Sequence, residues 1–249
     1  MRKRLVVGVG ILVLLLMVGA VAVWRMTQTN RDSADVPVYV PESASADSQR
    51  GSSSPFPSSA PAASTTAAST SGSAPASSTR AADVPAGCMP NLTEIAATTF
   101  TIDAMKVNSP VLSLGEDESG AAAAPPKNAS HSVGWWKNGP KVGSTAGHAI
   151  LTIHTYQNGK ALGNELNSAR SGLKPGDLVR MSDANGNTQC YQMERALKVW
   201  VKDYDPNSDV LYKFDGAPRA VIVICWDYNN LAKEWDSRIL YYLKPLANA

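Results

Sequence analysis

The chain has 249 residues, and its 23 Lys or Arg against 21 Asp or Glu give a formal net charge of +2 at pH 7. Apart from the extreme N-terminus, the basic residues are scattered along the chain, whereas nucleic-acid-binding proteins gather them on one face. Composition therefore excludes nucleic acid as the expected partner. Aromatic residues and alternating apolar residues concentrate in residues 87–249, which predicts one folded domain there.

The N-terminus carries the pattern of a membrane anchor. Three basic residues, 2–4, precede an unbroken apolar run over residues 5–24, and as a helix that run would span roughly 30 Å, the thickness of a bilayer core. Fewer basic residues, Arg25 and Arg31, follow it, so we expect residues 1–4 in the cytoplasm. A cleaved signal peptide is the alternative, because residues 20–22 are Ala-Val-Ala.

Residues 25–86 have low sequence complexity and are rich in Ser, Ala, Thr and Pro. Such a composition offers too little apolar surface to offset the loss of chain entropy on folding. We therefore expect a disordered stalk between the transmembrane anchor and the domain, and its simplest role is that of a spacer.

Short apolar segments with a period of two residues, separated by turn residues, fill the remainder of the chain. This pattern predicts an all-β barrel or sandwich with few helices. Asn185-Gly186 predicts a tight hairpin turn. We expect short helical turns at residues 161–170 and 208–214, and strands at residues 99–105, 111–114, 133–137, 149–155, 177–182, 189–202, 220–225 and 238–243.

Two of these strands, 149–153 and 220–225, are apolar without alternation, which indicates that both of their faces are buried. Each leads to a reactive side chain. His154 follows the first, and Cys225 closes the second, and polar residues typical of a loop come after both. Side chains at the ends of rigid strands beside loops are common positions for catalytic groups.

The chain has three cysteines, so one is left over if two of them pair. A disulfide between Cys88 and Cys190 would attach the start of the domain to a strand, and three free thiols are the alternative. Cys225 is the candidate for the unpaired thiol. A buried core cysteine is the competing interpretation of Cys225, because free cysteine packs as a small apolar residue.

Only three histidines are available as a proton carrier for a reactive thiol: His131, His148 and His154. His148 and His154 lie at the two ends of one predicted strand, roughly 20 Å apart, so only one of them can reach a given thiol. We expect His148 to be structural and His131 to be solvated in a polar loop. The spacing of these residues does not match a zinc site, and we expect no metal or cofactor.

The chain has, in this order, a predicted membrane helix, a stalk, residues 133–136 (VGWW), 149–154 (AILTIH), 173–177 (LKPGD) and 221–225 (VIVIC), and a late Arg238. This order carries a resemblance to the sortase family of Gram-positive bacteria. It extends over residues 102–246 and is strongest toward the actinobacterial members grouped as class F or class E. It implies a closed eight-stranded β-barrel.

The resemblance also implies roles for individual residues. His154 matches the family's catalytic histidine, Cys225 its nucleophile and Arg238 its arginine. Three positions depart from the family pattern. Val221 and Ile224 stand where the cysteine strand usually has threonine, and Ile153 stands where a glycine usually precedes the histidine.

The implied activity is that of a membrane-anchored cysteine transpeptidase. Such an enzyme cleaves a C-terminal sorting signal between Thr and Gly through a thioacyl intermediate, and transfers the protein to an amine of the cell wall or of a pilus. The implied partners are therefore surface proteins with a sorting signal, an amine acceptor and the cell membrane, which the N-terminal helix crosses once. Trp226 and Thr155, which directly follow the two reactive residues, are the candidates for substrate binding.

Two alternatives to this activity stay open. Val221 and Ile224 are compatible with a barrel that lost its activity and works as a cell-surface binding or assembly module. A cysteine hydrolase that cleaves without transfer is the other alternative.

Overall fold

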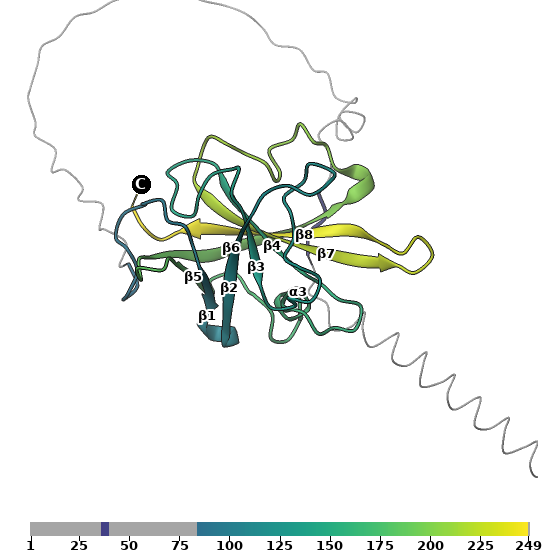
Figure 1. Ribbon diagram of the computed structural model, residues 1–249, viewed down its shortest axis with the longest axis horizontal. Helices are drawn as coiled ribbons and strands as arrows, with labels where there is room; N and C mark the ends of the chain where they lie inside the picture. The colour runs from purple at the N-terminus through teal and green to yellow at the C-terminus, as the bar shows by residue number, and fades with distance from the viewer. Residues whose placement is uncertain (1–35, 40–83, 249) are drawn as a thin grey trace, which may run out of the picture.

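The computed structural model describes residues 36–39 and 84–248 (Figure 1). Within these ranges eight strands close into a barrel in the order β1-β2-β3-β4-β7-β8-β6-β5. The all-β, closed eight-stranded fold expected from the sequence is confirmed. Most neighbouring strands run antiparallel, but β2 pairs with β3 and β4 pairs with β7 in parallel.

Each expected strand is present, with shifted ends. The strands are β1 (Thr99–Ile102), β2 (Val107–Leu114), β3 (Val133–Trp136), β4 (His148–Ile153), β5 (Leu178–Ser182), β6 (Thr188–Trp200), β7 (Arg219–Asn229) and β8 (Glu234–Pro245). The helices are short: the 3-10 turns η2 (Asp103–Met105) and η3 (Val201–Asp203), and α3 (Leu162–Leu166), which falls inside the expected 161–170.

Two expectations about these elements were wrong. Residues 208–214 form turns and irregular chain in place of the helical turn expected there. Cys225 does not close its strand, because β7 continues to Asn229 and pairs with β8 as far as Glu234. The β7–β8 hairpin therefore projects beyond the barrel (Figure 1). Within the extension, Asp227 adopts a positive φ of 53°.

Apolar side chains gather on both faces of the strands. An interior cluster fills the barrel and includes Phe100, Leu151, Ile222 and Tyr241. A smaller outer cluster covers the outside of β6, β7 and β8 and consists of Val199, Val221, Leu240 and Tyr242, with Leu197, Tyr204, Val210, Leu211 and Val223 packed against it. The two clusters explain why β7 lacks a polar face within the barrel, because its side chains alternate between them.

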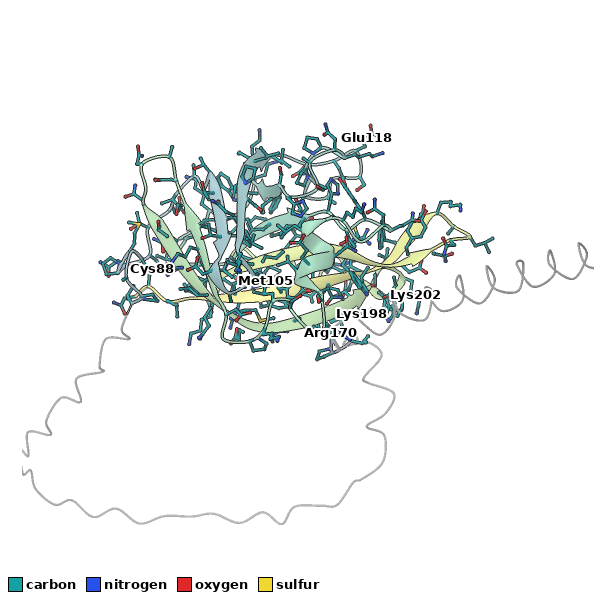
Figure 2. The ribbon with its side chains drawn as sticks, turned by 90° about the horizontal axis from the view of Figure 1, so that it is seen from below. Cys88, Met105, Glu118, Arg170, Lys198 and Lys202 are labelled. Atoms are coloured by element: carbon teal, nitrogen blue, oxygen red, sulfur yellow. A yellow bond between two sulfur atoms is a disulfide. The ribbon has the colours of Figure 1, made fainter. Side chains whose placement is uncertain are left out.

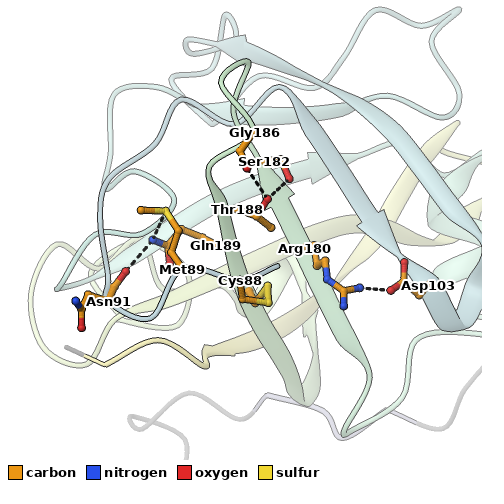
Figure 3. The surroundings of a disulfide bond; sticks show 10 residues. Cys88, Met89, Asn91, Asp103, Arg180, Ser182, Gly186, Thr188 and Gln189 are labelled. Atoms are coloured by element: carbon orange, nitrogen blue, oxygen red, sulfur yellow. Dashed lines mark hydrogen bonds and ion pairs between the residues drawn. A yellow bond between two sulfur atoms is a disulfide. The ribbon is translucent and has the colours of Figure 1, made fainter. Parts of the chain in front are cut away.

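A disulfide joins Cys88 to Cys190 on β6 across 102 positions of sequence (Figure 3). Gln189, which is fully buried, donates from its amide nitrogen to the backbone oxygens of Asn91 and Thr93, at 3.1 Å each. The start of the domain is therefore fixed to β6 by one covalent bond and by neighbouring hydrogen bonds.

In the described ranges, no helix has the length and apolar character that crossing a membrane requires. The expected anchor at residues 5–24 lies outside those ranges, and so does most of the expected stalk. Residues 36–39 and 84–86 of the expected stalk do lie within them. Val38 forms a parallel bridge with Lys198 of β6, because residues 36–39 (VPVY) are an apolar, extended stretch within the polar stalk.

Candidate active site

Three adjacent strands bring Cys225, His154 and Arg238 to one level of the sheet. In the parallel pair of β4 and β7, Ile153 lies opposite Ile224, so His154, directly after β4, and Cys225 of β7 are the next residues along the chain. In the antiparallel pair of β7 and β8, Cys225 lies directly opposite Arg238. The register thus places residues that are 13 to 84 positions apart in sequence side by side.

The side chains of these three residues point away from the barrel interior. Their neighbours Ile153, Ile224 and Ile239 all belong to the interior cluster. Successive side chains of a strand face opposite sides of the sheet. His154, Cys225 and Arg238 consequently meet on the outer face, where all three line one cavity of about 300 Å³.

The cavity, which we call the groove, has mostly apolar walls. Its floor is the outer face of the sheet, with Ile150, Thr152, Val199 and Leu240. Two loops form its sides: the β2–β3 loop, with Asp117, Ala121, Ala122 and Ala124, and the β6–β7 loop, with Tyr204, Leu211 and Tyr212. The backbone N–H of Ala122 donates to the hydroxyl of Tyr212 at 2.9 Å, so the two loops are joined across the groove.

The β2–β3 loop also contacts the floor next to His154. Thr152 donates from its hydroxyl to the carbonyl of Ala123 at 2.8 Å, and His154 Nε2 bonds the carbonyl of Pro125 at 2.6 Å. A carbonyl can only accept a hydrogen bond, so Nε2 carries a proton in this arrangement. The other ring nitrogen, Nδ1, is therefore the one that can take up or release a proton.

Cys225 is half-buried and is the free cysteine of the described residues. Burial raises the pKa of its thiol, because the charged thiolate loses hydration, and the positive charge of Arg238 opposes this effect by lowering the pKa. Arg238 is oriented by its own strand. Its Nη1 donates to the carbonyls of Ser237 and Trp235, at 2.9 and 3.0 Å.

The positions that depart from the family pattern lie on different faces. The side chain of Ile224 packs in the interior cluster, although Ile224 is also among the residues that line the groove. Val221 is fully buried in the outer cluster. Neither side chain can donate a hydrogen bond to a reacting group.

The two candidates for substrate binding do not line the groove. Trp226 follows Cys225 and therefore faces the opposite side of β7, where it packs against the interior cluster. Thr155 is buried, and its hydroxyl contacts no hydrogen-bond partner within the described part of the chain.

The other two histidines lie elsewhere. His148, at the start of β4, is buried and donates from Nδ1 to the carbonyl of Leu211 at 2.8 Å. His131 is exposed and bonds Glu165 through Nε2 at 2.8 Å. Among residues 36–39 and 84–248, no group of three or more His, Cys, Asp or Glu could hold a metal ion.

Sequence reasoning missed the groove residues that come from loops. Tyr204 and Tyr212 belong to a loop rich in Asp, Asn and Ser, and the pKa of both phenols is raised by burial. The hydroxyl of Tyr204 is buried without a hydrogen-bond partner in the described ranges. Aromatic residues inside a polar loop were the available signal. The role of Pro125 could not be predicted from its residue type, because it contacts His154 through its backbone carbonyl.

The fold and the groove define the class of the molecule as a closed eight-stranded β-barrel with a thiol, an imidazole and a guanidinium in one outer groove. A family model for the sortase domain matches residues 100–246, more than half of the chain, and the chain therefore belongs to the sortase family. Proteins of this family are generally cysteine transpeptidases.

Several solved structures are similar to the chain. Streptococcus agalactiae sortase C1, in complex with MTSET, is 16% identical, with 61% of this chain and 70% of that chain covered and a TM-score of 0.43. Sortase C-1 from Actinomyces oris is 20% identical (59% and 72% covered, TM-score 0.41), and sortase A from Corynebacterium diphtheriae is 13% identical (61% of each covered, TM-score 0.43). A comparison with curated proteins finds no match.

Proposed function

We propose that this chain is a membrane-anchored cysteine transpeptidase that cleaves a sorting signal between Thr and Gly and transfers the acyl part to an amine. The observation that carries the proposal is the common groove of Cys225, His154 and Arg238. Its apolar walls suit an extended peptide, and its open side gives the thiol access to a peptide carbonyl.

The first half of the reaction forms a thioester. His154 takes the thiol proton on Nδ1, and the sulfur of Cys225 attacks the carbonyl carbon between Thr and Gly. The guanidinium of Arg238 donates to the oxyanion that develops on the carbonyl oxygen. When the C–N bond breaks, Nδ1 returns the proton to the departing glycine nitrogen, and the threonine carbonyl remains bonded to sulfur.

The second half releases the product. An incoming amine attacks the thioester carbonyl and gives a proton to Nδ1 of His154, the C–S bond breaks, and Nδ1 passes this proton to the departing sulfur, which restores the thiol. The carbonyl of Pro125 accepts from Nε2 throughout and holds the ring in place. The amine belongs to a cell-wall precursor or to a pilin lysine, and the surface protein with the sorting signal is the substrate.

Intact-mass measurement of the purified protein after incubation with a sorting-signal peptide tests this function. We expect a covalent adduct with the mass of the acyl fragment, lost in Cys225→Ala and kept in His131→Ala, a histidine outside the groove. An added amine should convert the adduct to a peptide–amine product. Free acid alone would favour a hydrolase.

A non-catalytic binding or assembly module is the second candidate. It is supported by Val221 and Ile224, which supply no hydrogen-bond donor beside the thiol. Absence of any adduct with a library of sorting-signal peptides, together with measurable binding of one of them, would favour this module over the enzyme.

The location follows from the same proposal. With residues 5–24 as a single membrane span and residues 1–4 in the cytoplasm, the domain at residues 87–249 faces the outside of the cell. Membrane fractionation followed by protease treatment of intact cells checks this topology, and we expect the domain to be degraded from the outside.

A further inference from the structure

The edge of β6 that faces away from β8 is only partly covered by the barrel. β5 pairs with Thr188 to Gln192 on this edge, whereas β8 pairs with the other edge as far as Trp200. β5 begins at Leu178, which pairs with Gln192, so β5 has no residue to pair with the second half of β6. Residues 194–200 would thus present unpaired backbone groups.

Residues 36–39, which we call the added strand, lie against the part of this edge around Lys198 and are joined to it by a single bridge. Val38 pairs in parallel with Lys198. The N–H of Tyr39 donates to the carbonyl of Lys198, and the N–H of Lys198 donates to the carbonyl of Pro37, each at 2.6 Å. The bridge joins positions that are 160 residues apart in the sequence.

The side chains of the added strand alternate between the two apolar clusters. Val36 packs against the interior cluster and Tyr39 against the outer cluster, as strand periodicity requires. Tyr39 also lines a second cavity of about 1040 Å³ together with His148, Leu197 and Tyr242. The contacts therefore extend beyond two backbone bonds, and they select this apolar stretch from the polar stalk.

We propose that residues 194–200 of β6 are a strand-docking site for the chain's own residues 36–39, and that docking holds the domain close to its membrane anchor. The effect of docking on the distance between the domain and the membrane rests on the proposed function, in which residues 5–24 are the membrane anchor. Eleven residues, 25–35, then separate the anchor from the dock, and eleven residues span at most about 40 Å. Without the dock, the 62 residues 25–86 could span about 200 Å.

The dock also determines which side of the domain stands near the membrane. Lys198 lies next to Val199, which lines the groove. Lys198 and Cys88, where the chain enters the barrel, lie at opposite ends of the domain (Figure 2). Docking thus keeps the β6 side of the groove near the anchor, while the 44 residues 40–83 connect the two ends.

Hydrogen exchange of the full chain in membrane nanodiscs tests the docking, with the amide of Lys198 as the reporter. Tyr39→Pro removes a donor of the bridge, so we expect the Lys198 amide to exchange about tenfold faster. Val38→Pro is the matched control, because the two bonds of the bridge use the N–H groups of Tyr39 and Lys198 and not that of Val38. Unchanged protection of the β8 amides shows that each variant is folded.

A second measurement tests the distance between the domain and the membrane. A dye at Leu231→Cys, an exposed position on the β7–β8 hairpin, in a Cys225→Ala background reports energy transfer to labelled lipid headgroups. We expect lower transfer in Tyr39→Pro than in Val38→Pro. Equal exchange rates of the Lys198 amide in both variants would refute the docking of residues 36–39. Equal energy transfer would refute its effect on the distance between the domain and the membrane. Neither result depends on the catalytic activity, which the mass measurement tests separately.

Discussion

The thiol of Cys225 is exposed to two opposing electrostatic influences. Burial raises its pKa, and the guanidinium of Arg238 across the β7–β8 ladder lowers it. Burial is the larger influence, so the resting sulfur carries its proton at neutral pH. The thiolate that attacks the substrate must then form by transfer of this proton to a base within the groove, and His154 is the histidine that lines it.

We predict that Arg238→Ala moves the pH dependence of thiol alkylation to higher pH. The positive charge of Arg238 favours the thiolate, so its loss raises the pKa of Cys225 further. The rate of alkylation by iodoacetamide, measured from pH 6 to 10, reports the thiolate fraction. Activity with a sorting-signal peptide should fall about 10² to 10³-fold, the usual cost of a lost oxyanion donor.

Arg195→Ala is the matched control for this prediction. Arg195 stacks on the ring of Tyr242 on the same outer face, but it does not line the groove. Arg195→Ala should leave the pH dependence of thiol alkylation unchanged. An identical profile for Arg238→Ala and the unmodified protein would contradict the electrostatic role of Arg238.

His148 should make the stability of the domain depend on pH. Desolvation lowers the pKa of His148, and its hydrogen bond to Leu211 and the charge of Asp209 oppose this only in part, while Arg219 and Lys213 lower the pKa further. The unfolded chain therefore binds a proton more readily, starting near pH 6.5. We predict that the free energy of unfolding falls as the pH drops below about 6.5.

Urea unfolding at pH 7.5 and pH 5 measures this effect, and His148→Asn removes it. The asparagine amide would keep a donor near the carbonyl of Leu211 but cannot bind the proton, so the loss of stability between the two pH values should be smaller. An equal loss in both proteins would assign the pH dependence to other groups.

At the scale of elements, the β6–β7 loop is one wall of the groove, and three hydrogen bonds that involve side chains help to hold it. Tyr242 donates from its hydroxyl to the carbonyl of Val210, and His148 donates to the carbonyl of Leu211. The N–H of Ala122 on the β2–β3 loop donates to the hydroxyl of Tyr212. The first two contacts fix the loop to the barrel, and the third closes the groove from the other loop.

Tyr212→Phe should loosen the closure of the groove while it preserves the fold. The ring still packs against Trp136, whereas the N–H of Ala122 loses its acceptor. A hydrogen bond of this kind contributes about 0.5–1.5 kcal/mol, which corresponds to a decrease of about 2- to 10-fold in kcat/KM for a sorting-signal peptide. Steady-state kinetics with Tyr228→Phe as control measures it. A decrease of the same size in Tyr228→Phe would refute a specific role for the Tyr212 hydroxyl.

The sequence predicted the eight strands because their alternation and their bounding turns are local features. It did not predict that β7 runs on to Asn229, because Asp227 and Asn229 are typical of loops and the pairing partner that extends the strand is distant. The pairing of residues 36–39 with β6 was not predicted either, for the same reason. Their apolar character is visible, but the open edge of β6 exists only after the barrel closes.

In the candidate site, too, local features could be predicted from the sequence and long-range contacts could not. The types of Cys225, His154 and Arg238 and their positions in the strands can be recognised in the sequence. Their convergence depends on the parallel pairing of β4 with β7, which no local pattern indicates. The substrate-binding expectation for Trp226 followed from adjacency in sequence, and the alternation of strand faces turns that side chain to the barrel interior.

For the whole molecule, closure of the barrel relies on contacts between residues that are far apart in the chain, and the disulfide between Cys88 and Cys190 adds a covalent one. It closes a loop of about 100 residues, which in the chain-entropy model restricts the unfolded state strongly. The bond fixes the N-terminal segment to β6 at a distance from Lys198, and neither of its cysteines lines the groove.

We therefore predict that the double variant Cys88→Ala/Cys190→Ala is less stable by about 2–5 kcal/mol, yet keeps the activity of the unmodified protein at low temperature. Thermal unfolding with and without a reducing agent measures the effect. The reductant should lower the Tm of the unmodified protein to that of the variant and leave the variant unchanged, because Cys225 is then its remaining cysteine. A variant as stable as the oxidised protein would mean that the buried contacts of Gln189 with Asn91 and Thr93 fix the N-terminal segment without the covalent bond.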